Sequence, residues 1–359
     1  MRLAEVRGHD RIKPVLARAL ARDRVPPALL LAGPDGIGKK ALALALAQAL
    51  LCESAPRAEA CGECRTCRRV GSGLESLDAL RERADRRPDE DVWRNFRIHP
   101  DLVLAEGWWL TKTGRPRAEP EIRVDQVRDL IVEISGTPFE ARRRVFVIDD
   151  AHTMNDAAQN ALLKSLEEPP ARSHVVLVSS SPVGLRQTVR SRCQTLRFGP
   201  LPRAVIASVL QERAGLTEDE ARLRAGVAGG SVGAALALES ESYRQLRDRL
   251  VSLLESLGSL DALGRMRAAQ ELEQSDGPIA LLTTLCSLLR DVAAARAGAA
   301  AGSLVNADLA PRLAALGAGP LGERAGALAE RAGAARGAVR GFANKLLTFD
   351  VLVDALASD

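Results

Sequence analysis

The sequence contains few aromatic residues: one tyrosine, three tryptophans and six phenylalanines among 359 residues. Alanine, leucine and valine must therefore do most of the packing, and the first two favour helices. No basic segment is interleaved with aromatic residues, so nothing indicates a stacking platform for single-stranded nucleic acid. The net charge of +4 permits contact with nucleic-acid phosphates but does not require it.

A long apolar run is also missing. No stretch approaches the ~18 apolar residues of a membrane span, and residues 41–51 form the most apolar segment of helical length. Residues 1–10 contain neither an apolar core nor a cleavage signal. We therefore expect a cytoplasmic protein with no membrane partner. In that reducing compartment, clustered cysteines indicate a metal more often than a disulfide.

The order of apolar segments predicts an α/β fold. Short apolar runs typical of buried parallel strands alternate with helical patterns, and such sheets bind ligands at the carboxyl ends of their strands. The expected strands are 28–32, 102–105, 144–150 and 174–179, and the expected helices are 9–22, 40–51, 124–134 and 155–168.

The remaining segments set the predicted domain boundaries. Residues 71–98 are charged and are expected to form a solvated insertion with one exposed helix over 74–84, and residues 108–120 are expected to form a loop. No buried strand is predicted after residue 202. We expect an α/β core over 1–200, a helical lid over 201–245 and a helical collar over 246–359, which makes three domains.

Residues 33–40 read Gly-Pro-Asp-Gly-Ile-Gly-Lys-Lys, which is a phosphate-binding P-loop except at its last position. In such a loop the backbone N–H groups around Gly33, Gly36 and Gly38 face phosphate oxygens, and Lys39 reaches the outer phosphates. Lys40 stands where a serine or threonine hydroxyl holds Mg²⁺, so hydrolysis of Mg-ATP here is not expected. A glycine-rich turn without any ligand is the alternative, and static nucleotide binding stays open.

Two acidic residues, Asp149 and Asp150, follow the apolar run at 145–148. In an active ATPase the first acid holds Mg²⁺ and the second, usually glutamate, orients the attacking water. Asp150 is one methylene shorter than glutamate, and near-attack geometry tolerates little displacement. The alternative is a pair of acids that cap the helix beyond the strand.

Four cysteines, Cys52, Cys61, Cys64 and Cys67, follow the spacing C-x8-C-x2-C-x2-C. Four thiolates suit tetrahedral zinc, so we predict a structural zinc module over 52–67. An iron–sulfur cluster of the bacterial ferredoxin type would need a further cysteine at position 71, which is glycine. Free thiols are the remaining alternative.

Ser191-Arg192-Cys193 forms a short motif beyond the last predicted strand. A guanidinium is always charged and its forked donors suit phosphate oxygens. An arginine in a short loop is more often an ordinary surface residue. The position of Arg192 after the P-loop and the acidic strand end makes it a candidate for phosphate chemistry.

These motifs, taken in order, resemble those of the AAA+ clamp-loader subunits of bacterial DNA polymerase III, and the delta-prime subunits most closely. The resemblance covers residues 1 to about 240 strongly and the helical tail weakly. It is carried by Asp149–His152 running into 160–170, by the cysteine module, and by the segments 191–193, 99–102 and 344–347.

The resemblance implies an AAA+ core, lid and collar, and it implies a role for Arg192 as an arginine finger acting on a neighbouring ATPase subunit. The first sensor of the family falls at Ser179 or Ser180, and both remain open. The arginine that follows the Gly-Ser-x-Gly turn of the lid is Ala234 here. Lys40, Asp150 and Ala234 thus depart from the active pattern.

The implied function is that of a delta-prime subunit in a heteropentameric ring with ATPase motor subunits and a delta subunit. This ring opens a sliding clamp and closes it on primed DNA, while the delta-prime subunit braces the ring. Two alternatives stay open: an ATP-hydrolysing motor subunit, and a zinc-dependent nucleic-acid-binding protein on a decayed ATPase scaffold.

Overall fold

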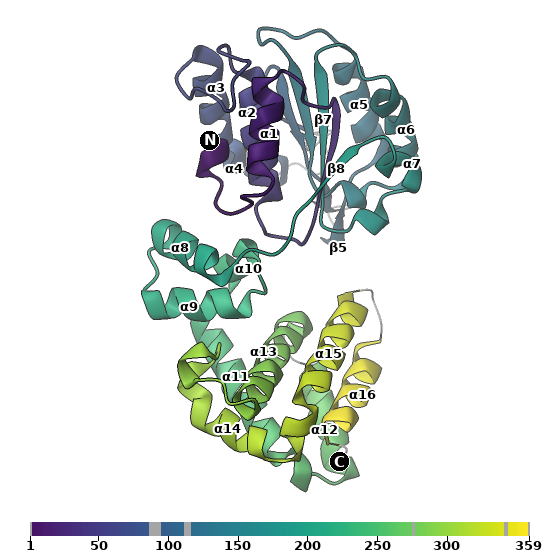
Figure 1. Cartoon of the computed structure of the whole chain (residues 1–359). Coiled ribbons are helices and arrows are strands. Elements are labelled where there is room, and N and C mark those ends of the chain that lie inside the picture. The colour runs from purple at the N-terminus through teal and green to yellow at the C-terminus, as the bar shows by residue number, and fades with distance from the viewer. Residues whose placement is uncertain (1, 86–94, 111–115, 275–276, 341–343, 358–359) are drawn as a thin grey trace. The chain divides into compact units, whose positions relative to one another are not determined.

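The computed structural model describes the chain except for residues 1, 86–94, 111–115, 275–276, 341–343 and 358–359 (Figure 1). The described residues form two compact units. The first unit comprises Met1–Val205 together with Gly230–Gly233, and the second comprises Ile206–Gly229 and Ala234–Asp359. The finer division into core, lid and collar remains a prediction.

A six-stranded sheet forms the centre of the first unit, in the order β2-β3-β6-β7-β1-β8. Strand β1 lies between β7 and β8 and is parallel to both, with Leu30 opposite Leu177 and Thr195. The edge strand β2 is antiparallel to β3. The strands are β1 (Ala28–Ala32), β2 (Asn95–His99), β3 (Leu102–Ala105), β6 (Arg144–Ile148), β7 (Ser173–Ser179) and β8 (Gln194–Arg197). The predicted α/β fold class with a parallel sheet core is confirmed.

Helices cover both faces of this sheet (Figure 1). Helices α5 and α6 pack with the apolar residues of one face, where Phe146, Leu162 and Leu177 lie in one core cluster. Helix α2 packs on β6 and β7 from the other side. The helices are α1 (Lys13–Ala21), α2 (Lys39–Leu51), α3 (Arg65–Glu75), α4 (Leu77–Asp85), α5 (Val124–Ile134), α6 (Asp156–Glu167) and α7 (Gln187–Arg190), with short 3-10 turns at Leu3–Glu5, Ala151–Thr153 and Pro182–Gly184.

Two expectations about this unit were wrong. The segment 108–120 is not a loop, because β4 (Trp108–Leu110) pairs with β5 (Pro116–Glu121). The insertion 71–98 is also more ordered than its charge suggested. The helix expected over 74–84 is present as α4, but the segment also contains the end of α3 and most of β2. Residues 86–94 lie outside the described part. Strand β2 alternates buried Phe96 and Ile98 with exposed Arg97, a pattern that charge had obscured.

The second unit contains helices and no strand among its described residues, as predicted after residue 202. Its core is built almost entirely of leucine and alanine around Phe349. The helices are α8 (Arg203–Ala214), α9 (Glu218–Val227), α10 (Val232–Ala237), α11 (Ser240–Ser256), α12 (Ala262–Glu273), α13 (Pro278–Arg296), α14 (Ala310–Ala318), α15 (Pro320–Arg340) and α16 (Lys345–Ala357), with 3-10 turns at Leu257–Ser259, Ala301–Ser303 and Ala307–Leu309.

Helix α13 corrects the expectation that no segment approaches the length of a membrane span. Its 19 residues have a window of mean hydropathy 1.4, so it could cross a membrane by length and composition. Leu282, Leu288 and Leu289 are fully buried within the second unit. A central core helix of a helical domain has this composition because it is apolar on most of its circumference.

A buried carboxylate, Asp101, organises the loop that precedes β6. Its oxygens accept hydrogen bonds from the backbone N–H groups of Phe139, Glu140 and Ala141 at 2.7, 3.0 and 2.9 Å. Asp101 is 1% exposed, so its carboxylate depends on these hydrogen bonds rather than on water. The loop at 139–141 is thereby fixed at the amino end of β6.

Replacing this carboxylate is expected to destabilise the protein. Asp101→Ala leaves three backbone donors without their acceptor and should lower the free energy of unfolding by roughly 3 kcal/mol. Asp129→Ala removes an exposed carboxylate from α5 and should change it by less than about 0.5 kcal/mol. Urea denaturation of both variants measures the difference, and equal stabilities would contradict the role given to Asp101.

Candidate nucleotide site and cysteine cluster

The glycine-rich loop joins β1 to α2 at the carboxyl edge of the sheet, as its sequence predicted. Gly38 has a φ of 93°, in the left-handed region, where it begins α2. A Cβ atom at Gly33 would lie 2.4 Å from the carbonyl oxygen of Phe198. Both positions therefore require glycine for the backbone to follow this path.

The groups that would bind phosphate have partners within the chain. The Asp35 carboxylate accepts a hydrogen bond from the Gly36 N–H at 2.7 Å. The buried Lys39 ammonium donates to the carbonyl oxygen of Pro34 at 2.5 Å. Burial lowers the pKa of Lys39, and nearby carboxylates oppose that shift. A phosphate entering the loop would have to displace a carboxylate of the same sign.

Two other segments hold the loop from outside. His9 Nε2 lies 2.7 Å from the carbonyl oxygen of Ile37, and its ring packs edge-on against Phe198. The Gly230–Gly233 turn, which belongs to the first unit, donates the Gly233 N–H to the carbonyl oxygen of Gly36 at 2.9 Å. A Cβ on Gly36 would lie 2.2 Å from the Ser231 hydroxyl, so the turn packs closely on the loop.

The structure brings Lys40 and Asp149 together, with Lys40 Nζ 2.6 Å from Asp149 Oδ2. The same ammonium lies 2.9 Å from Glu106 Oε1. Burial disfavours the ammonium, but the two carboxylates outweigh it and raise the pKa of Lys40. Asp150 adjoins the pair in a left-handed conformation, with φ of 45°, and burial raises its pKa.

Sequence reasoning missed Glu106 and its partner Arg81. Arg81, on α4, donates from Nε to Glu106 Oε2 at 3.0 Å and from Nη2 to Oε1 at 2.5 Å. Burial opposes the effect, but Arg81 and Lys40 lower the pKa of Glu106 to about 2. Glu106 follows the apolar run at 102–105, so the rule that selected Asp149 could have found it. No sequence signal pairs it with Arg81.

The two candidate sensor serines differ in their surroundings. The Ser179 carbonyl oxygen accepts the Gly33 N–H at 3.2 Å, so this residue adjoins the loop. Its hydroxyl is fully buried without a hydrogen-bond partner among the described residues. The Ser180 hydroxyl lies 3.2 Å from His152 Nε2 instead. Ser179 is therefore the serine placed beside the loop.

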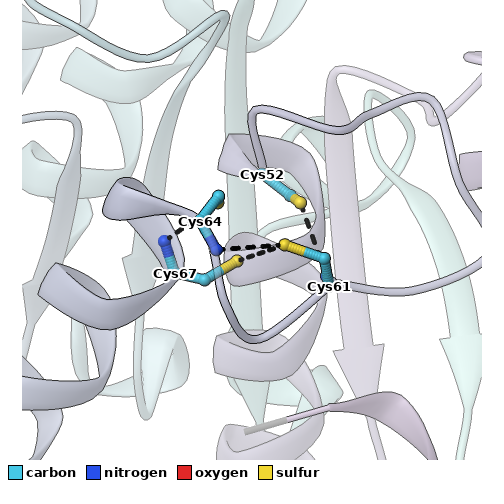
Figure 2. Close-up of side chains that lie close together, drawn as sticks. All are labelled: Cys52, Cys61, Cys64 and Cys67. Atoms are coloured by element: carbon cyan, nitrogen blue, oxygen red, sulfur yellow. Dashed lines mark hydrogen bonds between the residues drawn. The ribbon is translucent and has the colours of Figure 1, made fainter.

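The four predicted cysteines form one cluster (Figure 2), and their sulfur atoms all lie within 4.8 Å of one another. A tetrahedral ion with metal–sulfur distances of about 2.3 Å separates its sulfur ligands by about 3.8 Å. The Sγ atoms of Cys61 and Cys67 lie 3.9 Å apart. Backbone N–H groups point at three of the sulfurs, among them Cys64 N at 3.3 Å from Cys61 Sγ. The residues fit a four-thiolate metal ion.

Polar contacts attach this cluster to the sheet. The Gln48 side chain, on α2, donates to the Cys67 carbonyl oxygen at 3.0 Å. Arg69, on α3, forms an ion pair with Glu140, in the loop that Asp101 fixes. His99 Nε2 lies 2.9 Å from the same carboxylate. The His-Pro-Asp segment at 99–101 therefore connects the sheet edge to the cysteine module.

Arg192 lies beyond α7, away from the cysteine cluster in sequence, and its neighbour Cys193 is buried. Its guanidinium donates from Nε to Glu167 Oε1 at 2.6 Å and from Nη1 to the Thr188 carbonyl oxygen at 2.8 Å. The side chain is 31% exposed. The arginine is thus at the surface, held in one orientation by an acid on α6 and by the last turn before it.

A parallel sheet whose first strand runs into a glycine-rich loop and a helix, with an acid at the end of β6, two strands away, defines a P-loop domain of the AAA+ type. Here the Lys40 ammonium lies against that acid, Asp149. A family model described as DNA polymerase III, delta subunit, matches residues 8–202. The chain belongs to this family, within the clamp-loader subunits of the delta-prime type.

Individual relatives agree with the family. The chain is 35% identical over 232 residues to DNA polymerase III subunit delta' of Pseudomonas aeruginosa, covering 64% of this chain and 61% of the relative. It is 30% identical over 248 residues to subunit delta' of Bacillus subtilis, covering 69% and 64%. It is also 29% identical over 267 residues to subunit tau of Salmonella typhimurium, covering 72% and 36%. The matched region thus spans less than two thirds of each of these relatives.

Proposed function

We propose that this chain is the delta-prime subunit of a cytoplasmic clamp loader, in a heteropentameric ring with ATPase motor subunits and a delta subunit. It braces the ring and donates Arg192 to the nucleotide site of a neighbouring ATPase subunit. The ring loads a sliding clamp onto primed DNA. The chain's own P-loop has no catalytic part in this function.

The orientation of Arg192 is the observation that carries the proposal. Two contacts, to Glu167 and to Thr188, fix the guanidinium at the surface rather than over the chain's own P-loop acids. An exposed ion pair of this kind contributes little to stability, about 0–1 kcal/mol. A pre-oriented guanidinium loses less freedom when it meets phosphate oxygens, which suits an arginine finger.

The contacts within the chain's own P-loop also support a subunit that assists hydrolysis in a neighbour and does not hydrolyse ATP itself. Lys40 neutralises Asp149, and Asp35 occupies a backbone donor of the loop. No hydroxyl follows Lys39 to hold Mg²⁺, and Asp150 is too short to place a water in line. The similarity to tau keeps the motor subunit as the second candidate.

The cysteine cluster is proposed to hold one structural Zn²⁺. Four thiolate ligands leave no open position for substrate, so zinc would organise residues 52–67 without taking part in chemistry. Cys67 lies in the first turn of α3, the helix whose Arg69 contacts Glu140.

Removal of the metal is expected to unfold this module. Purified protein should contain about one zinc per chain, and Cys67→Ser should reduce the zinc content and expose the segment 52–75 to protease. Cys193→Ser, outside the cluster, should retain full zinc content. Elemental analysis and limited proteolysis measure both effects; iron with visible absorption, or no metal, would contradict the zinc assignment.

The isolated chain is expected to hydrolyse ATP negligibly, because Lys40 opposes a metal and Asp150 is too short. Lys40→Thr should restore little turnover, since Asp150 and Ala234 still depart from the active pattern. A coupled phosphate-release assay on the isolated protein measures this. Robust turnover by the wild-type chain would favour the motor subunit instead.

Arg192→Ala is expected to leave folding, zinc content and ring assembly intact while lowering DNA-stimulated ATP hydrolysis by the assembled ring. A trans arginine contributes roughly 10³–10⁵ in rate at its own site. The loss in the ring should be partial, because the other interfaces supply their own arginines. Arg192→Lys should not restore the rate fully, because an ammonium cannot fork onto two oxygens.

Arg186→Ala provides the matched control for this measurement. Arg186 is another exposed arginine beside α7, and it also pairs with an acid of α6, Asp156, at 3.3 Å. Its replacement should leave the ATPase rate of the ring unchanged. An Arg192→Ala ring with wild-type ATPase and clamp-loading rates would make Arg192 an ordinary surface residue.

A further inference from the structure

The contacts of Lys40 carry an inference that does not depend on the role of Arg192. Lys40 is the second residue of α2, and its ammonium lies between an acid that follows β3 and an acid that follows β6. The distances are 2.9 Å to Glu106 Oε1 and 2.6 Å to Asp149 Oδ2. Both carboxylate side chains are only 10% exposed, and the Lys40 ammonium forms an ion pair with each of them.

The insertion that precedes β2 supplies a second cation. Arg81 places two nitrogens on the Glu106 carboxylate and a third on Asp78, at 2.7 Å, within α4. Glu106 thus receives Lys40 from one side and Arg81 from another. A buried carboxylate without a partner is strongly unfavourable, and these cations favour the ionised form of both acids. For Glu106 they outweigh burial, whereas burial still raises the pKa of Asp149 against the effect of Lys40.

The residues at this position do not fit Mg²⁺. Mg²⁺ requires close to six oxygen ligands at about 2.1 Å, and it gives up water reluctantly. Here the space between the two acids holds a nitrogen that carries the same sign of charge as the metal and cannot act as a ligand while protonated. The two carboxylates within 3 Å of this nitrogen favour its protonated form.

We propose that the Lys40 ammonium is a covalently attached replacement for the metal ion of a P-loop site, and that Arg81 completes the charge balance. The site is then neutralised by the chain itself and keeps its folded form without Mg²⁺ or nucleotide. This gives the charged insertion a function, because its helix α4 carries Arg81, the second cation that neutralises the two acids.

Lys40→Thr tests this inference on the full chain. The variant removes the ammonium, leaves Glu106 and Asp149 facing one another, and adds a hydroxyl, which together make a set of oxygen ligands for a hard divalent cation. Without added metal, its melting temperature should fall by about 5–10 °C. Millimolar Mg²⁺ should restore part of this loss saturably, whereas the wild-type melting temperature should not respond. Magnesium is added and no chelator is used, so that the cysteine cluster is left intact.

Two further variants control the measurement. Lys40→Thr with Glu106→Gln lacks one of the two acids and should lose the Mg²⁺ response. Lys164→Thr removes an exposed lysine from α6 and should match the wild type at every Mg²⁺ concentration. If the Lys40→Thr variant does not fold, Arg81→Met, which keeps Lys40, should melt lower than the wild type and stay indifferent to Mg²⁺.

Three results would overturn the proposal. One is saturable stabilisation of the wild-type chain by Mg²⁺ that Glu106→Gln abolishes, because the metal would then bind despite Lys40. Another is a Lys40→Thr variant as stable as the wild type and indifferent to Mg²⁺. The third is an Arg81→Met variant that gains a Mg²⁺ response. An ATPase result on the isolated chain bears on the proposed function and leaves this inference untouched.

Discussion

The parallel placement of β1 between β7 and β8 is the constraint on which the rest of the first unit depends. All residues of β1 are buried, and its carboxyl end is fixed by hydrogen bonds on both sides: Gly33 to Ser179, and Ala32 to Phe198. Because neighbouring parallel strands end at the same edge, the glycine-rich loop, Glu106 and Asp149 are brought to one place. Lys40 can then form ion pairs with both acids, and Arg81 can pair with Glu106.

Much of this arrangement could be predicted from the sequence, because the central strands are continuous apolar runs that are buried on both faces. The strands at 28–32, 102–105, 144–148 and 173–179 have this character. The missed strands are different: β2 and β8 are partly exposed, and β4 and β5 lie in a small separate sheet. Polar, exposed strands depend on their neighbours for hydrogen bonds, and a linear pattern does not reveal those neighbours.

The candidate sites also differ in how far they could be predicted, according to whether their residues are close together in the sequence. The cysteine cluster and the loop are local in sequence, since spacing alone places their members together. Lys40 and Glu106 are 66 positions apart, and their pairing follows from strand order rather than from any motif. Likewise, the link from Asp101 through Glu140 to α3 joins three separate segments. Long-range polar contacts of this kind are set by tertiary packing, which single-sequence patterns do not encode.

The return of the chain to the first unit at Gly230–Gly233 has a consequence for the order of folding. The Gly233 N–H donates a hydrogen bond to the Gly36 carbonyl oxygen, although residues 206–229, which lie between them in the sequence, belong to the other unit. During synthesis, amino-terminal domains generally fold first. Here the glycine-rich loop cannot receive this contact until residue 233 has left the ribosome. The first unit therefore gains its last hydrogen bond to this loop only after residues 206–229, which belong to the second unit, have been synthesised.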